Sequence, residues 1–139
     1  MDTIKTILVN HRVKKGDAVM FDIDDTLIRA DSGKPMYAII ELLNLSIFLG
    51  YTVVIITARP DYVENVTHTE QQLVDLGINY NLLLFCPPQE KTNKKKETGL
   101  NYILSVGDQL TDLEGGLYFL KLPDYTDTRY YIGSSTSSD

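Results

Sequence analysis

Two aspartates, Asp22 and Asp24, follow a short apolar stretch at positions 18–21. The stretch, Ala-Val-Met-Phe, is typical of a buried β-strand. Side chains two positions apart in extended backbone leave on the same side, so the two carboxylates repel each other unless a cation lies between them. Mg²⁺ is the simplest hard divalent ion with a preference for such oxygen ligands. The alternative interpretation is an ordinary acidic turn that leads into a helix.

Polar side chains also follow two later apolar stretches. Thr57 ends one of them, and Asp108 and Asp112 follow another. The carboxyl ends of the strands in an open parallel sheet face one crevice, so we expect these three residues to lie beside the first two aspartates. A carboxylate can attack phosphorus, a second can protonate the leaving oxygen, a cation can offset the anionic repulsion, and Thr and Lys can hold phosphoryl oxygens. The set of groups therefore favours chemistry at a phosphoryl centre.

The elements that would position these groups alternate between strand and helix from Ala18 onward. This order predicts an α/β fold with a Rossmann-like, doubly wound parallel sheet of about five strands and helices on both faces. Strands are expected at 18–21, 52–56, 82–85, 102–106 and 117–122. Helices are expected from Thr3 to His11, from Pro35 to Gly50, from Pro60 to Gly77 and, as a short helix or turn, from Gln89 to Gly99.

Length and composition favour one domain, predicted at residues 1–132, with a disordered Ser/Thr-rich tail at 133–139. A chain of 139 residues with 43% apolar content can bury one real core but not two. The net charge of −6 and pI near 4.8 argue against a broad basic surface for nucleic acid. No apolar run approaches a membrane span, and the first residues do not open a signal peptide. We expect a soluble cytoplasmic protein, in which the single cysteine, Cys86, is a buried thiol at the end of a strand.

The sequence resembles the haloacid-dehalogenase-like (HAD) superfamily over roughly residues 16–123. The run Asp-Ile-Asp-Asp-Thr-Leu at 22–27 is similar to its first motif, Asp-x-Asp-x-Thr/Val. Thr57 is similar to the second motif, and Gly-Asp-Gln-Leu-Thr-Asp at 107–112 fits the fourth motif, Gly-Asp-x-x-x-Asp. The resemblance implies a phosphatase of the capless kind.

Two branches of the superfamily share further features with this chain. Gly-Asp-Gln at 107–109, together with Phe-Leu-Lys-Leu-Pro at 119–123, looks like the acid-phosphatase and vegetative-storage-protein branch. Gly-Tyr at 50–51 before an apolar strand also resembles polynucleotide 3′-phosphatase domains.

The resemblance implies a role for each acidic residue. Asp22 would be the nucleophile that forms an aspartyl-phosphate, and Asp24 would be the general acid and base. Mg²⁺ would be held by the carboxylates of Asp22 and Asp108 and the backbone carbonyl of Asp24, with Asp112 in support. An acid at Asp24 separates the chain from dehalogenases, which lack it, and from transport ATPases, which carry Thr there.

The phosphate would be held by Thr57 and by the lysine of the third motif. The segment Lys-Thr-Asn-Lys-Lys at 91–95 resembles the branch's Lys-Ser-x-x-Arg pattern, so Lys91 is the first choice and Lys94 the second. Lys95 and Lys96 are expected to be a solvated charge run. Arg59 is a third candidate to reach the phosphate, or else it forms a salt bridge on its loop.

Three functions follow from these observations. The leading hypothesis is a Mg²⁺-dependent phosphomonoester hydrolase. The alternatives are a nucleic-acid 3′-phosphatase or nucleotidase, and a catalytically silent storage or binding protein on the same scaffold. The gaps at 28–34 and 86–100 are too short for a cap domain, so the crevice is expected to accept a large phosphorylated partner: a nucleotide, an oligonucleotide end or a phosphoprotein. The sequence leaves the oligomeric state open.

Overall fold

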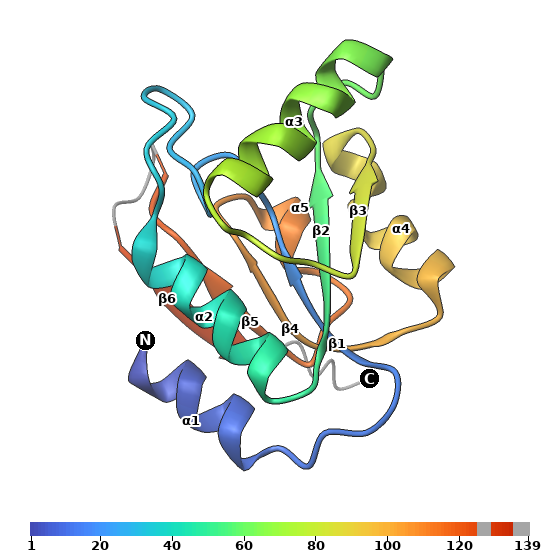
Figure 1. The fold of residues 1–139 in the computed structure, drawn as a ribbon. Helices are drawn as coiled ribbons and strands as arrows, with labels where there is room; N and C mark the ends of the chain where they lie inside the picture. Colours follow the sequence, from blue (N-terminus) through green and yellow to red (C-terminus); the bar gives the residue numbers. More distant parts are fainter. Residues whose placement is uncertain (125–128, 135–139) are drawn as a thin grey trace.

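A mixed sheet of six strands forms the centre of the molecule, with helices packed on its two faces (Figure 1). This computed structural model describes residues 1–124 and 129–134. The strands are β1 (Asp17–Phe21), β2 (Thr52–Thr57), β3 (Leu82–Phe85), β4 (Asn101–Gly107), β5 (Tyr118–Lys121) and β6 (Tyr131–Ser134). The helices are α1 (Asp2–Asn10), α2 (Tyr37–Phe48), α3 (Val63–Asp75), the 3₁₀ turn η1 (Pro88–Glu90), α4 (Lys91–Thr98) and α5 (Leu110–Leu113).

The strand order is β3-β2-β1-β4-β5-β6, with β1 and β4 as central neighbours. The first five strands are parallel, and β6 runs antiparallel to β5. The order 3-2-1-4-5 of the parallel strands is consistent with a Rossmann-like fold, and it puts the change of winding direction between β1 and β4. The predicted parallel α/β sheet is confirmed, but its predicted number of about five strands is corrected to six.

The sixth strand includes two residues of the predicted tail. Gly133 and Ser134 were expected in a disordered tail, yet both belong to β6, where Gly133 pairs with Phe119 of β5. A Cβ atom on Gly133 would lie 2.4 Å from the Phe119 ring, so glycine allows this ring to lie against the strand. Residues 135–139 of the predicted tail lie outside the described residues.

Alternate residues of the central strands supply two separate cores. Val19 and Phe21 face the larger core, which β1 shares with α1, α2 and α3, whereas Ala18 and Met20 face a smaller one. All of β1 is buried, as expected for a parallel strand covered on both faces. Alternate residues of β2 face the same two cores. The two strands pair in a register that places Phe21 opposite Ile55 of β2.

The start of α3 differs from the prediction. The helix begins at Val63 and not at Pro60, and it turns Thr69 and Leu73 inward. Val63 and Val74 of the same helix are 76% and 67% exposed. Ile47 of α2 is 38% exposed.

The segments between β1 and α2 and between β3 and β4 are short. Between β1 and α2, the chain makes a tight loop in which Ile28 forms isolated bridges with Asp24 and Pro35. Between β3 and β4 lie η1, α4 and short loops. Among residues 1–124 and 129–134, no helix is long and apolar enough to cross a membrane. Cys86 lies buried just after β3, as predicted.

Candidate active site

Three aspartates meet where β1 and β4 end. Asp22 directly follows β1, Asp108 directly follows β4, and Asp112 lies in α5. One carboxylate oxygen from each residue lies within 4.8 Å of the others, and all three residues are buried. Their proximity follows from the topology, because β1 and β4 are parallel neighbours whose carboxyl ends meet at one edge of the sheet.

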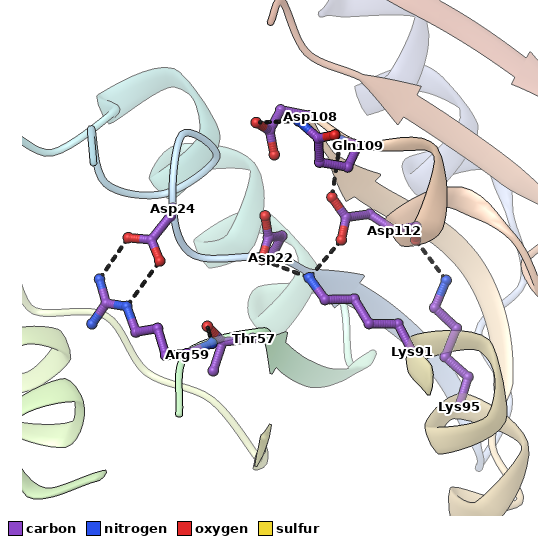
Figure 2. A network of polar contacts seen from close by, with 9 residues as sticks. All are labelled: Asp22, Asp24, Thr57, Arg59, Lys91, Lys95, Asp108, Gln109 and Asp112. Atoms are coloured by element: carbon purple, nitrogen blue, oxygen red, sulfur yellow. Dashed lines mark hydrogen bonds and ion pairs between the residues drawn. The ribbon is translucent and has the colours of Figure 1, made fainter. Parts of the chain in front are cut away.

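Lys91 lies between two of these aspartates (Figure 2). Its ammonium donates hydrogen bonds to Asp22 Oδ1 at 2.8 Å and to Asp112 Oδ1 at 2.6 Å, and the residue is 3% exposed. Lys91 begins α4, directly after η1, so the Pro-containing turn sets where the lysine enters the site. Lys94, the second choice from the sequence, instead forms an ion pair with Glu97 at 3.4 Å and has a partly exposed side chain.

The carboxylates outnumber the positive charge at this point. Burial and the charge of Asp112 raise the pKa of Asp22 well above its usual value, against the opposing effect of Lys91. Burial also raises the pKa of Asp108. Burial lowers the pKa of Lys91, but the charges of Asp22 and Asp112 outweigh it and raise that pKa, which keeps Lys91 an ammonium. One ammonium does not neutralise three buried carboxylates, so a further positive charge would be favourable at this point.

This donor set fits a divalent metal ion such as Mg²⁺, because it consists of carboxylate oxygens alone and is short of positive charge. Both oxygens of Asp112 are already engaged, by Lys91 Nζ and by the backbone N–H of Gln109. Asp22 engages one oxygen with Lys91, and Asp108 engages one with the Gln109 amide. Asp22 and Asp108 are therefore the better candidates for direct metal ligands. Asp112 instead positions Lys91 and the backbone of Gln109 beside them.

The position of Asp112 depends on a glycine. A Cβ atom on Gly107 would lie 2.3 Å from both Cβ and Oδ2 of Asp112, closer than atoms can approach. Gly107 is the last residue of β4, so the aspartate packs directly against the end of that strand. Gln109 and Asp112 also form a reciprocal capping box at the start of α5. The local geometry thus requires the glycine at position 107 and its spacing from Asp112.

Asp24 is turned towards Arg59 (Figure 2). Arg59 donates from Nη2 to Asp24 Oδ1 at 2.8 Å and from Nε to Asp24 Oδ2 at 3.0 Å. Its third nitrogen, Nη1, is anchored on α3 by Thr69 at 3.1 Å and Gln72 at 2.9 Å. The structure gives Arg59 a salt bridge, but with Asp24 after β1 and not within its own loop as predicted, and the predicted contact with phosphate stays a prediction. The side chain of Asp24 remains 39% exposed, so other groups can still reach it.

Thr57 is the last residue of β2 and is fully buried. Its hydroxyl oxygen accepts a hydrogen bond from the backbone N–H of Arg59 at 3.1 Å. The hydroxyl proton is left to be donated elsewhere, which is the chemistry that the predicted phosphate contact requires. That contact stays a prediction.

Lys95 corrects the expectation of a solvated charge run. It is 1% exposed and donates hydrogen bonds to Ser105 Oγ at 2.8 Å, to the Asp112 carbonyl at 2.7 Å and to the Glu114 carbonyl. Burial lowers the pKa of Lys95 to about 8, against the opposing charge of Asp112. The helical period offered a signal, because Lys95 lies four residues after Lys91 and so shares its face of α4. Lys96, the next residue, is exposed as expected.

Comparison with known proteins shows a fold and not a family. The sequence matches no protein-family model and no curated protein. A chain in the solved structure of the Pnkp1/Rnl/Hen1 complex is similar over 72% of this chain, with a TM-score of 0.56 and 21% sequence identity. The match covers 42% of that chain, so the present sequence corresponds to less than half of its neighbour.

Proposed function

We propose that this chain is a metal-dependent phosphatase that hydrolyses phosphomonoesters through an aspartyl-phosphate on Asp22. The observation that carries the proposal is the cluster in which Asp22, buried at the end of β1, shares Lys91 with Asp112 and lies beside Asp108. A nucleophilic carboxylate, a fixed ammonium and an oxygen-only metal site are the parts that phosphoryl transfer through a carboxylate needs. The resemblance to the HAD motifs supports the same assignment.

The proposed reaction has two steps. In the first, a carboxylate oxygen of Asp22 attacks phosphorus, the bond from phosphorus to the ester oxygen breaks, and protonated Asp24 gives its proton to the departing alcohol. In the second, Asp24 takes a proton from water, the water oxygen attacks phosphorus, and the Asp22–phosphorus bond breaks to release phosphate. Asp22 and Asp24 both return to their starting states.

The chain's other residues hold the anionic group in place. Lys91 places its charge against Asp22, and Thr57 has a hydroxyl proton to donate at the end of the neighbouring strand. Asp22 and Asp108 would hold the divalent ion, which supplies the positive charge that offsets repulsion between phosphate and carboxylates. Each oxygen of Asp24 accepts one hydrogen bond from Arg59 and keeps a second lone pair, and the half-exposed side chain lets the proton be transferred there.

A phosphate at the end of a nucleic acid is the candidate substrate within this class. A cavity of about 360 Å³ lies beside Asp108 and Gln109 and is lined in part by Arg29 and Tyr130. Because no inserted domain covers this edge within residues 1–124, a bulky leaving group can approach it. The similarity in fold to a chain of the Pnkp1/Rnl/Hen1 complex favours this candidate over a storage protein, as does an aspartate at position 22.

The purified chain, assayed with Mg²⁺ and p-nitrophenyl phosphate, tests the proposed chemistry. Asp22→Asn keeps the size of the side chain but removes the anionic nucleophile, so hydrolysis is expected to fall by several orders of magnitude while the melting temperature shows a folded protein. Asp75→Asn, an exposed change on α3, is the control. If Asp22→Asn retains more than about a tenth of the activity, catalysis through a covalent aspartyl-phosphate is wrong.

A substrate panel separates the candidates within the class. It contains 3′-phosphorylated and 5′-phosphorylated oligonucleotides, mononucleotides, a phosphopeptide and small sugar phosphates, all measured as kcat/KM under one set of conditions. We expect the 3′-phosphorylated oligonucleotide to give the highest value. A steep preference for one small sugar phosphate would contradict the expectation of an open crevice.

A further inference from the structure

Lys95 is a second buried lysine near the candidate site, and the reaction proposed above does not use it. It lies one helical turn after Lys91 on α4, so the two side chains run side by side towards α5 (Figure 2). Lys91 bonds the carboxylate of Asp112, and Lys95 bonds the backbone carbonyl of the same residue. Both ends of Asp112 are therefore held by lysines from one helix.

The surroundings of Lys95 are complete. An ammonium group has three N–H bonds, and three oxygens accept them: Ser105 Oγ of β4 and the carbonyls of Asp112 and Glu114. None of the three is a carboxylate, and among the described residues Lys95 forms no ion pair, so the nearby charge of Asp112 offsets its burial only in part. Burying an ammonium that bonds only neutral acceptors costs folding free energy. The presence of such a group here points to a need to hold the bonded backbone in a fixed position.

Lys95 bonds the segment formed by α5 and the turn after it, which cannot satisfy its own backbone carbonyls. Helix α5 has four residues, so its last carbonyls lack partners within the helix. The chain then turns at Gly115, where a Cβ atom would lie 3.4 Å from Lys95 Cδ. The aliphatic stem of Lys95 thus packs beneath the turn while its ammonium bonds the carbonyls on either side of Leu113.

We propose that Lys95 is a positioning residue that fixes α5, and through it sets the positions of Asp112 and Asp108 at the metal-binding edge of the sheet. This inference rests on the proposed function, because it assumes that Asp22 and Asp108 take up a divalent ion. The two lysines have different roles. Lys91 bonds the carboxylates of the site, whereas Lys95 bonds the backbone that carries Asp112.

The alternative is that Lys95 only fills space beneath the turn. Lys95→Met separates the two possibilities, because methionine keeps most of the stem but removes the three N–H donors. If only packing matters, Mg²⁺ binding is unchanged in this variant. If position matters, α5 loses its anchor and Mg²⁺ binding weakens, since groups that orient metal ligands commonly change metal affinity by about 10- to 100-fold when mutated.

The test measures binding of Mg²⁺ alone by titration calorimetry, together with the rise in melting temperature that Mg²⁺ causes. We expect the Mg²⁺ dissociation constant of Lys95→Met to rise by about tenfold or more. Lys96→Met, its exposed neighbour on α4, is the matched control and is expected to bind within about twofold of wild type. Ile4→Val, in the core of the opposite face, lowers stability without touching the site and should leave Mg²⁺ binding unchanged.

Several outcomes would overturn the inference. Wild-type Mg²⁺ affinity in Lys95→Met would do so, as would an equal loss of affinity in Ile4→Val at a matched drop in melting temperature. If Lys95→Met does not fold, Lys95→Ala is measured, because water can enter its smaller side-chain space and bond the three oxygens but cannot tie them to α4. The same loss of affinity is expected there, and wild-type affinity would again overturn the inference.

The readout also keeps this inference separate from the proposed function. A wild-type chain that binds Mg²⁺ but hydrolyses no phosphomonoester would refute the phosphatase and leave the role of Lys95 standing. A wild-type chain that hydrolyses phosphomonoesters, beside a Lys95→Met variant that binds Mg²⁺ normally, would refute the role of Lys95 alone.

Discussion

Both carboxylate oxygens of Asp24 accept hydrogen bonds from the guanidinium of Arg59, which is itself fixed to α3 through Thr69 and Gln72. The position of the proposed acid and base is therefore set by a helix that contributes no other group to the proposed site. A planar, forked donor is needed for this arrangement, because a single ammonium cannot reach both oxygens and both anchors.

Arg59→Lys is expected to keep the charge but lose this geometry. The predicted result is a fall in kcat of about tenfold or more, because a misplaced acid transfers its proton poorly. The measurement is steady-state hydrolysis of p-nitrophenyl phosphate in Mg²⁺. Arg12→Lys, an exposed change before β1, is the control, and equal activity in the two variants would show that the fork is not needed.

Lys91→Ala is expected to reduce kcat by about a hundredfold or more, since it removes a fixed positive charge from a buried phosphoryl site. It also leaves the carboxylates of Asp22 and Asp112 without their shared ammonium. Breaking a buried ion pair in this way costs about 3–5 kcal/mol of folding free energy, so a lower melting temperature is expected as well. Lys94→Ala should change both quantities little, and the opposite ranking would move the assignment to Lys94.

Removal of divalent metal is expected to abolish hydrolysis and lower the melting temperature. Burial and the charge of Asp112 raise the pKa values of Asp22 and Asp108, and the one ammonium of Lys91 does not offset this effect. An ion bound only by the folded chain therefore stabilises it. Saturation at about 100 times the dissociation constant adds about 2.7 kcal/mol to the free energy of unfolding. Scanning calorimetry with chelator and then with excess Mg²⁺ measures the effect. Asp108→Asn should lose most of it, and a full shift in that variant would exclude Asp108 as a ligand.

Asp17 predicts a pH dependence of stability away from the site. Burial acts to raise its pKa, but hydrogen bonds from His11, the Lys14 backbone N–H and Asn101 outweigh burial and lower it below the ordinary 3.8. A lowered folded-state pKa stabilises the fold above pH 3.8, and that stabilisation is lost as pH falls through the folded-state value.

Urea unfolding of wild type and Asp17→Asn across pH 2–7 measures this contribution. The wild type is expected to be the more stable above about pH 4, with the difference shrinking as the pH falls further. Asp75→Asn is the control, because its exposed carboxylate lies in no such network of hydrogen bonds to three partners. A difference that stays constant down to pH 2 would show that the ionised form of Asp17 is not what stabilises the fold.

The parallel sheet and the meeting of the aspartates were predictable because both follow from local patterns. Apolar strands that alternate with amphipathic helices specify a parallel order, and a parallel order brings strand ends to one edge. The assignment of Asp22, Asp108 and Asp112 to one place needed no knowledge of side-chain packing. The choice of Lys91 over Lys94 depended on the resemblance in sequence, and the structure places only Lys91 between the carboxylates.

The features that the sequence did not predict depend on contacts between residues far apart in the chain. Strand β6 is four residues long, carries a glycine and depends on β5 for its pairing, so it has little local signal. Lysines in a polar segment are expected to be solvated. The four-residue spacing from Lys91 indicates a shared face of α4, but the burial of Lys95 depends on the packing of α5 against that face. Likewise, the inward face of α3 is chosen partly by the hydrogen bond from Arg59 to Thr69, a contact ten residues apart that hydrophobic periodicity cannot report.

The two cores of the sheet differ greatly in size, and the proposed site depends on the smaller one. Within the part of the chain that the structure describes, the core shared with α1, α2 and α3 contains 21 buried residues, and the core on the other face contains six. The buried side chains of α4 are the two lysines. Local unfolding of α4 therefore exposes little apolar surface, and it costs less free energy than unfolding the sheet. The layer that carries Lys91 and Lys95 can thus open while the sheet stays folded, and the site can be lost while most of the fold remains intact.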